Sequence, residues 1–340
     1  MNIYLLGALG ALISLIIGII LYKIFIPVLR KVKLGQKILE IGPSWHKCKE
    51  GTPNLGGLFF FVAFACAVAF ELILGKKYLE SDELIKLLTA LGLAFLSGLI
   101  GFVDDYVKLF KKRNKGLSAT QKLILQFASV GAYLFCNAYF CGYDTVIDFP
   151  WGASVDFGIF YYIVMLLAIT YIINCANLTD GIDGLAGSIA FLICITFMFF
   201  GMKNDSFVFS APASAFAGAL LAFLIFNFHP AKIFMGDTGS LLIGGFVVGL
   251  AMLTNCEFLL VPISLIWIIE GVSVVLQVLS FKLTGKRIFK MAPIHHHFEK
   301  CSWSEVKIVL VFSLVTALFC GLTYWLLTYN IIIRPSIKKG

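Results

Sequence analysis

Charged residues are scarce in this sequence. Asp, Glu, Lys and Arg make up 14% of the 340 residues, whereas a soluble protein usually carries about a quarter. Apolar residues make up 60% of the chain and gather in long blocks, which short charged segments separate. This composition excludes an ordinary soluble globular protein and indicates that lipid is the main solvent of the chain.

Cysteine patterns that would mark a disulfide framework or a zinc knuckle are also absent. The nine cysteines are odd in number, include no Cys-x-x-Cys pair and lie mostly within apolar blocks, so we expect ordinary buried side chains. The first apolar run lacks a basic leader and is too long for a signal peptide, so we expect it to span the membrane. Without repeats or low-complexity tracts, residues 1–340 are predicted to form a single integral membrane domain.

Ten apolar segments are long enough to cross the membrane as helices of about 20 residues. They are 3–26, 55–74, 84–103, 123–141, 158–175, 184–200, 211–228, 239–254, 257–281 and 305–330. The predicted fold is therefore an all-α polytopic membrane protein with ten transmembrane helices. The ninth segment contains Glu270 and Gln277, so we expect it to bend or to pack inside the bundle, with Glu270 hydrogen-bonded there.

Positive charge is concentrated in alternate loops. The loops after the odd-numbered segments carry 18 of the 27 lysines and arginines. The positive-inside rule places these loops in the cytoplasm and both termini outside. The cytoplasmic loops are 27–53, 104–122, 176–183, 229–238 and 282–304. Orientation and contact with anionic lipids would by themselves explain most of this basic excess.

Half of the ten aspartates lie at the predicted cytoplasmic ends of the helices, in or beside these basic loops. They are Asp104, Asp105, Asp180, Asp183 and Asp237. Ionisable groups at membrane depth are costly and usually functional. Five carboxylates at one depth on one face therefore predict a single site assembled from three segments.

Each fragment of this site also has a plain structural interpretation. Lys108 follows Asp105 at a helical spacing and could form a simple ion pair at a helix end. Asp183 could cap a helix, or it could belong to a glycine-lined bay for a polyanionic or flat ligand. Asp237, between two glycines, could cap a helix or help to hold a hard cation.

Three consecutive histidines, His295 to His297, follow Pro293 in a basic loop. Their imidazoles could contact phosphate or substrate, could bind zinc together with Cys301, or could be solvated without a role. Adjacent residues do not share a helix face, so a single metal held by all three would need an irregular backbone. Lys47 and Thr52 precede a glycine pair and offer another phosphate contact.

Six motifs in chain order closely resemble those of the phospho-N-acetylmuramoyl-pentapeptide transferases, within the superfamily of polyprenyl-phosphate sugar-1-phosphate transferases. They are HKCKEGTPNLGG, GFVDDYVK, KGLSATQK, NLTDGIDG, FNFHPAKIFMGDTGS and APIHHHFE. The first and last motifs distinguish this branch from the wider superfamily. The departures, at Asn54-Leu55 and Thr120, put only the roles of those positions in doubt.

The resemblance implies a reaction in the membrane stage of bacterial peptidoglycan synthesis. Undecaprenyl phosphate would attack the sugar-linked phosphate of UDP-MurNAc-pentapeptide, giving the lipid-linked sugar and UMP. Mg²⁺ would be the cofactor, the active site would face the cytoplasm, the carrier lipid would lie beside the bent ninth helix, and the protein would form homodimers. No nucleic acid partner is expected.

The resemblance also implies roles for individual residues. Asp104 and Asp105 would be the catalytic pair, with Asp104 deprotonating or orienting the lipid phosphate, and Asp237 would ligate Mg²⁺. A covalent aspartyl intermediate is an open alternative. The uridine pocket would be formed by Asn177, Asp180, Gly181, Asp183 and Phe234. Phosphate, sugar or other substrate contacts would come from Lys47, Thr52, Lys108, Lys122, Asn227, His295, His296 and His297.

Two other functions compete with this interpretation. An ion-coupled transporter would place its carboxylates near the bilayer midplane, often within inverted repeats, whereas these aspartates gather at one surface. A sister transferase that uses UDP-GlcNAc shares the aspartate motifs. The histidine motif separates the two transferases.

Overall fold

Helices form most of the part of the chain that the structure, a computed structural model, describes: residues 2–31, 51–110, 116–149 and 152–328. The long helices are α1 (Ile3–Lys31), α2 (Gly56–Gly75), α3 (Ser81–Phe110), α4 (Ala119–Phe140), α5 (Ile159–Thr179), α6 (Leu185–Lys203), α7 (Phe207–Asn227), α8 (Gly236–Met252), α10 (Leu265–Thr284) and α12 (Glu305–Thr328). The short helices are α9 (Leu260–Ile263), α11 (Ile294–Glu299) and the 3-10 turns Lys76–Tyr78 and Glu257–Leu259.

Nine helices in these ranges are long and apolar enough to cross a membrane, which confirms a multi-pass membrane protein. The remaining predicted span, the eighth (239–254), corresponds to α8, which is apolar but has only 17 residues. Every residue of α8 from Thr238 to Met252 is buried. This helix packs chiefly against α3 and α5, so protein rather than lipid surrounds it.

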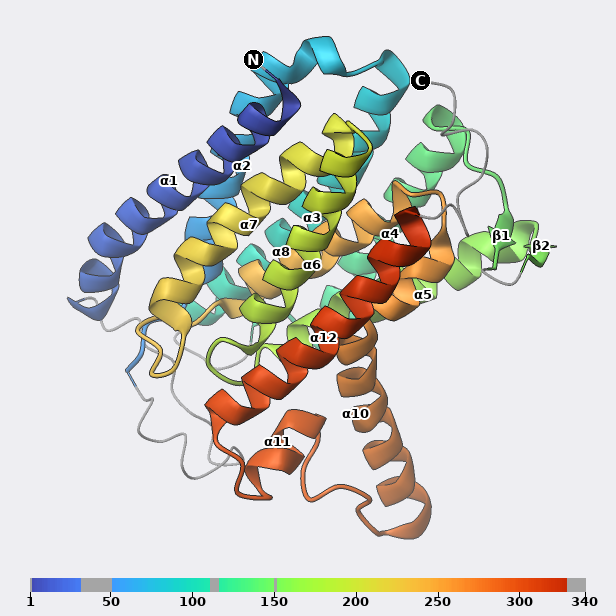
Figure 1. The fold of residues 1–340 in the computed structure, drawn as a ribbon. Coiled ribbons are helices and arrows are strands. Elements are labelled where there is room, and N and C mark those ends of the chain that lie inside the picture. The colour runs from blue at the N-terminus through green and yellow to red at the C-terminus, as the bar shows by residue number, and fades with distance from the viewer. Residues whose placement is uncertain (1, 32–50, 111–115, 150–151, 329–340) are drawn as a thin grey trace.

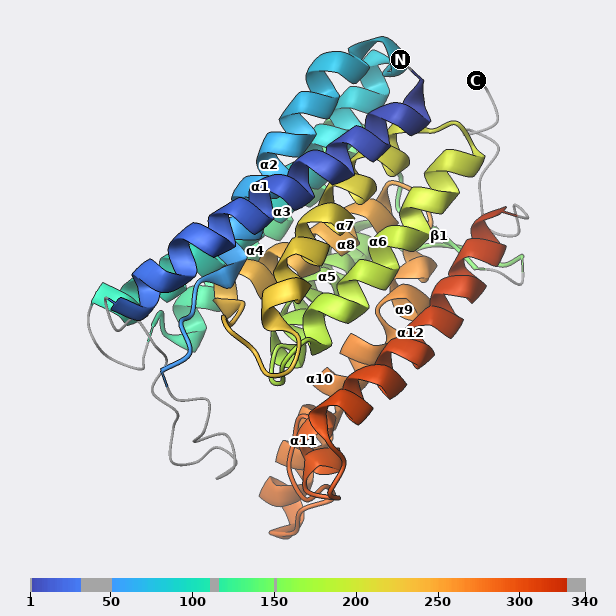
Figure 2. The ribbon, with the colours of Figure 1, turned by 60° about the vertical axis from the view of Figure 1, so that its left-hand side comes forward.

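The helices are arranged with α8 in the middle of the bundle. α1, α2 and α7 pack together along one side, and α12 lies against α6. In both views the start of α1 and the turn between α2 and α3 lie at one end of the bundle, and α11 lies at the other (Figures 1 and 2). The α7–α8 turn lies at the same end as α11, so the chain's chemistry-bearing motifs gather there.

The ninth apolar segment is broken at Ser264, before its polar residues Glu270 and Gln277, which both lie in one continuous helix. It divides into Glu257–Leu259, α9 and α10, with Ser264 between the last two helices. α10 leans away from the other helices and carries α11 beyond the end of the bundle (Figures 1 and 2). Glu270 on this helix is fully buried, so it packs inside the protein as expected.

Two features differ from the sequence prediction. α3 continues to Phe110, past the apolar segment, so Asp104 and Asp105 are helical residues rather than loop residues. The structure also has an antiparallel two-stranded hairpin, β1 (Val146–Asp148) and β2 (Ser154–Asp156), whereas the other regular elements in the described ranges are helices. The hairpin strands have only three residues each, too few for a periodic pattern in the sequence.

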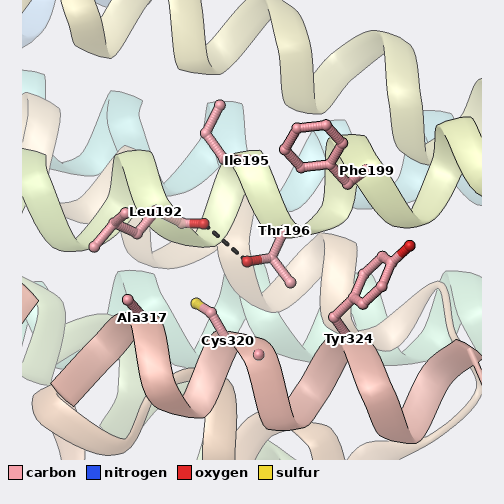
Figure 3. A pocket seen from close by; sticks show the side chains of 8 residues that line it. Leu192, Ile195, Thr196, Phe199, Ala317, Cys320 and Tyr324 are labelled. Carbon is pink, nitrogen blue, oxygen red and sulfur yellow. Dashed lines mark hydrogen bonds between the residues drawn. The ribbon is translucent and has the colours of Figure 1, made fainter. Parts of the chain in front are cut away.

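A cavity of about 420 Å³ lies between α6 and α12 (Figure 3). Its lining is almost entirely apolar, and the hydroxyl of Thr196 donates to the backbone oxygen of Leu192 at 2.9 Å. None of the predicted substrate or catalytic residues lines it. This cavity therefore suits a hydrocarbon chain better than a nucleotide.

Candidate functional site

The site is built where the end of α3 meets the start of α8. Gly101 makes this approach possible, because a Cβ there would lie 2.1 Å from the backbone oxygen of Asp237. The contact brings Asp104, Asp105 and Asp237 together, with one ligand oxygen from each within 4.8 Å of the others. The sequence prediction that these aspartates converge is therefore confirmed in geometry.

Asp105 holds the first turn of α8. One of its oxygens accepts hydrogen bonds from the backbone N of Thr238 at 2.9 Å and from the Thr238 hydroxyl at 2.7 Å. The other accepts from the backbone N of Asp237 at 3.2 Å. A carboxylate suits this place because the start of a helix presents free N–H groups and a positive dipole end. Asp105 is 1% exposed, so its carboxylate oxygens are occupied by these hydrogen bonds, which fix the start of α8 against α3.

Two lysines neutralise the other aspartates. Lys108 Nζ lies 2.6 Å from Asp104 Oδ2 and 3.1 Å from Asp237 Oδ2. Lys122, on α4, places its Nζ 2.8 Å from the same oxygen of Asp237. Asp104 also accepts from the backbone N of Leu117 at 2.7 Å. Three carboxylates thus face two ammonium groups, which leaves the cluster one negative charge.

The end of α5 adds Asn177 and Asp180 to this cluster. The Asn177 amide donates to Asp237 at 3.1 Å and to Ser240 at 2.7 Å. Asp180 follows the helix, and its side chain has no hydrogen bond within the described residues. Burial and the nearby carboxylates Asp237, Asp105 and Asp183 raise the pKa of Asp180 well above its usual value. Asp180 is the carboxylate left free for a cation or a hydrogen-bond donor.

Asp183 ties the following turn to the α7–α8 loop. Its carboxylate accepts from the backbone N of Ala231 at 3.0 Å and contacts His229 Nδ1 at 3.2 Å. Its own backbone N donates to Glu305 at the start of α12 at 3.1 Å. The residue at the N-cap of α6 is Gly184, without a side-chain cap, so the interpretation of Asp183 as a helix cap is wrong.

Sequence reasoning missed His229 and Glu305. With Asp183 they form a second group whose ligand atoms lie within 4.8 Å of one another. Glu305 is a single acidic residue at the start of an apolar helix, and His229 stands apart from the histidine run. His229 does lie within the motif FNFHPAKIFMGDTGS, which is the signal that could have identified it.

Asn227 and Phe234 shape the loop that leads into α8. The Asn227 amide oxygen accepts from the backbone N of Gly184 at 2.9 Å, and its nitrogen donates to the oxygen of Ile233 at 2.9 Å. The backbone of Phe234 pairs with Pro53 and Gly56 at 2.8 Å each. Thr52 adjoins this pairing and is half-buried. Lys47 lies outside the described residues.

The three histidines diverge within α11. His295 contacts Glu270, His296 contacts Glu299, and the Nδ1 of His297 accepts from the backbone N of Lys290 at 3.1 Å. A thiol pairs with only one of them, since Cys301 Sγ lies 3.8 Å from His297 Nε2. Among the residues that the structure describes, the three rings and Cys301 do not form a metal cluster.

The donor set of the aspartate cluster fits Mg²⁺. It offers carboxylate oxygens, and Mg²⁺ is usually held by one or two carboxylates together with substrate phosphates. Two of the three aspartates are engaged, Asp105 by α8 and Asp104 by Leu117 and Lys108. Asp237 is the most exposed of the three carboxylates, with 20% of its side chain accessible. A cation there would replace lysine contacts rather than backbone ones.

The sequence matches known enzymes along nearly its full length. Residues 87–255 match the family described as glycosyl transferase family 4. A protein of Clostridium beijerinckii, named phospho-N-acetylmuramoyl-pentapeptide-transferase, is 45% identical over 312 residues, which are 92% of each chain. The chain belongs to the phospho-N-acetylmuramoyl-pentapeptide-transferase family. Proteins with the same name from Clostridium perfringens strain 13 and Halalkalibacterium halodurans are 44% and 40% identical, over 92% and 93% of this chain and 96% and 95% of their own lengths.

Membership of this transferase family agrees with the geometry of the site. The family match includes Asp104, Asp105, Asn177, Asp180 and Asp237, all of which lie within residues 87–255. The carboxylates sit at one end of the bundle rather than at its middle, which is unlike the midplane site of an ion-coupled transporter. The chain is therefore a membrane-embedded transferase.

Proposed function

We propose that this protein transfers phospho-MurNAc-pentapeptide from UDP-MurNAc-pentapeptide to undecaprenyl phosphate. A phosphate oxygen of the lipid attacks the sugar-linked phosphorus, the bond between the two phosphates of UDP breaks, and UMP leaves. The observation that carries this proposal is the cluster of three aspartates and two lysines at one end of the membrane bundle. It supplies charges of both signs for phosphoryl transfer, as the names of the relatives imply.

Within this cluster we assign distinct tasks to the charged residues. Lys108 and Lys122 reach Asp237 in the structure, and they would bind the diphosphate once a cation takes their place on that carboxylate. Asp104 would orient or deprotonate the lipid phosphate. Mg²⁺ held by Asp237 would neutralise charge on the transferring phosphate and the leaving group.

The nucleotide would lie beside the α5–α6 turn. Asp180 is free of hydrogen bonds within the described residues, so it would accept from donors of the uridine. Gly181 keeps the backbone open next to His295. Asp183 and Asn227 tie the surrounding loops together. Asn177, Thr52, Phe234, His296 and His297 would line the remaining surface, with Lys47 supplied by a segment outside the described residues.

We further propose the orientation that the distribution of basic residues predicts. The cluster end of the bundle would face the cytoplasm of a bacterium, as would the predicted cytoplasmic segments 27–53, 104–122, 176–183, 229–238 and 282–304, and both termini would face outward. The carrier lipid would approach along α10, which leans away from the bundle. A homodimer in the bacterial cell membrane is the expected assembly.

The test is a transfer assay with the purified full-length protein and undecaprenyl phosphate. Radiolabelled UDP-MurNAc-pentapeptide and UDP-GlcNAc are supplied in parallel, and the label in the lipid phase is measured. We expect transfer from the first nucleotide sugar only, and loss of transfer in D104N. Transfer from UDP-GlcNAc alone would show that the protein is the sister enzyme.

A further inference from the structure

A buried carboxylate–imidazole pair lies apart from the aspartate cluster. Glu270 on α10 and His295 on α11 are both fully buried. His295 Nδ1 lies 3.1 Å from Glu270 Oε2, and the backbone N of His295 donates to the same oxygen at 3.5 Å. Because this oxygen accepts from the backbone N–H, it is placed to accept from the ring as well, an arrangement that favours the tautomer with its proton on Nδ1.

The other ring nitrogen faces the turn that carries Asp180. His295 Nε2 is buried and has no hydrogen-bond partner within the part of the chain that the structure describes. A Cβ on Gly181 would lie 2.2 Å from this nitrogen, so the absence of a side chain there lets the ring reach the turn. Buried polar atoms are nearly always paired. An unpaired nitrogen beside the proposed nucleotide pocket therefore indicates a group that arrives with the substrate.

We propose that Glu270 is a positioning residue that holds His295 in the tautomer protonated at Nδ1, so that Nε2 accepts a hydrogen bond from the nucleotide sugar. In the neutral ring this tautomer leaves a lone pair on Nε2. That lone pair accepts a hydrogen bond from a hydroxyl or N–H group of the sugar or nucleoside, whereas it would repel an unprotonated phosphate oxygen. The inference rests on the proposed function. It narrows the expected partner of His295 from any phosphate or sugar group to a group of the substrate that donates a hydrogen bond to Nε2.

The pairing explains why a carboxylate is buried in a helix that leans out of the bundle. A carboxylate behind a histidine fixes both the orientation and the tautomer of the ring. Without an acceptor at position 270, the ring is free to carry its proton on Nε2. The Nε2–H group and the substrate's hydrogen-bond donor would then face each other, and neither could accept. Loss of one such hydrogen bond corresponds to about a tenfold weaker interaction.

Two variants of Glu270 and one control separate positioning from simple packing. E270L removes the acceptor and keeps a side chain of similar bulk. E270Q keeps an amide oxygen that can accept from Nδ1. Ser273 is the matched control, because it is buried one turn further along α10 and its hydroxyl donates to the backbone oxygen of Glu270.

The measurements are steady-state transfer kinetics and histidine tautomer assignment by nitrogen NMR. Both use the full-length protein in detergent, labelled with ¹⁵N-histidine, and the H295N variant identifies the His295 signals. We expect Nδ1 protonation in the wild type and in E270Q, and a shift to Nε2 protonation in E270L. The KM for the nucleotide sugar should rise about tenfold in E270L, with most of it recovered in E270Q and no change in S273A.

The proposal is overturned if wild-type His295 carries its proton on Nε2, or if folded E270L keeps the wild-type KM. If E270L does not fold, the wild-type tautomer and the KM of E270Q decide the question. Wild-type turnover is measured first. Its absence with UDP-MurNAc-pentapeptide would refute the proposed function, whereas normal wild-type turnover with an unaffected E270L would refute this inference alone.

Discussion

Replacing Asp105 by asparagine should unfold the start of α8 and not merely slow the reaction. The carboxylate accepts three hydrogen bonds from Asp237 and Thr238. The asparagine amide can accept at one oxygen only, and its NH₂ group would face an N–H donor. Each hydrogen bond to a charged group contributes about 1.5–3 kcal/mol, so the change should lower the free energy of unfolding by about 3 kcal/mol.

Thr238→Val is the matched control for this prediction. It removes only the hydroxyl that donates to Asp105 at 2.7 Å, and its expected cost is about half that of D105N. Thermal unfolding of the purified proteins in one detergent measures the order, which should be wild type, then T238V, then D105N. D104N should unfold near the wild-type temperature while losing transfer. Wild-type thermal stability in D105N would refute the assignment of Asp105 to the α8 start.

Three further predictions concern the nucleotide bay and the orientation. The raised pKa of Asp180 means that the folded state binds its proton more tightly than the unfolded state does. Stability should therefore fall as pH rises above the unfolded-state pKa of about 4. D180N should remove that fall and stabilise the ligand-free protein at neutral pH, which pH-dependent thermal unfolding measures. D183N should weaken uridine nucleotide binding in calorimetric titration, because it removes the negative charge from the oxygen that contacts both Ala231 and His229. Unchanged affinity would return Asp183 to a purely local role. Cysteines at the exposed positions Ser118 and Ser154 should react with an impermeant maleimide from opposite sides of the membrane, and labelling of both from one side would contradict the orientation.

The location of the site could be predicted from the sequence, because hydropathy shows where each apolar run ends and the charges beside it show which side of the membrane that end faces. Asp104, Asp105 and Asp237 stand at the ends of apolar runs among basic residues, and that distribution alone brought them to one face. The multi-pass helical fold followed from the apolar runs, and the burial of Glu270 inside the protein from its polar side chain in an apolar segment. The short buried α8 also overlaps a predicted segment, 239–254.

The partners within the site could not be predicted, because they depend on how helices rotate and pack against one another. Lys122 reaches Asp237 from α4, 115 residues away in sequence, whereas helical spacing pointed only to Lys108 as a partner of the aspartates. The contact between Asp183 and His229 and the pairing of Glu270 with His295 are likewise long-range. Helical periodicity says which face of a helix is apolar and does not say which neighbour it meets.

We propose that the aspartate cluster performs metal-dependent transfer, with Asp237 as the metal ligand. The direct measurement is transfer from UDP-MurNAc-pentapeptide as a function of Mg²⁺ concentration after treatment with EDTA, in the wild type and in D237N. We expect wild-type activity to disappear with EDTA and to return with Mg²⁺ or Mn²⁺, and folded D237N to stay inactive throughout the titration. Near-wild-type turnover of D237N at low Mg²⁺ would contradict the claim.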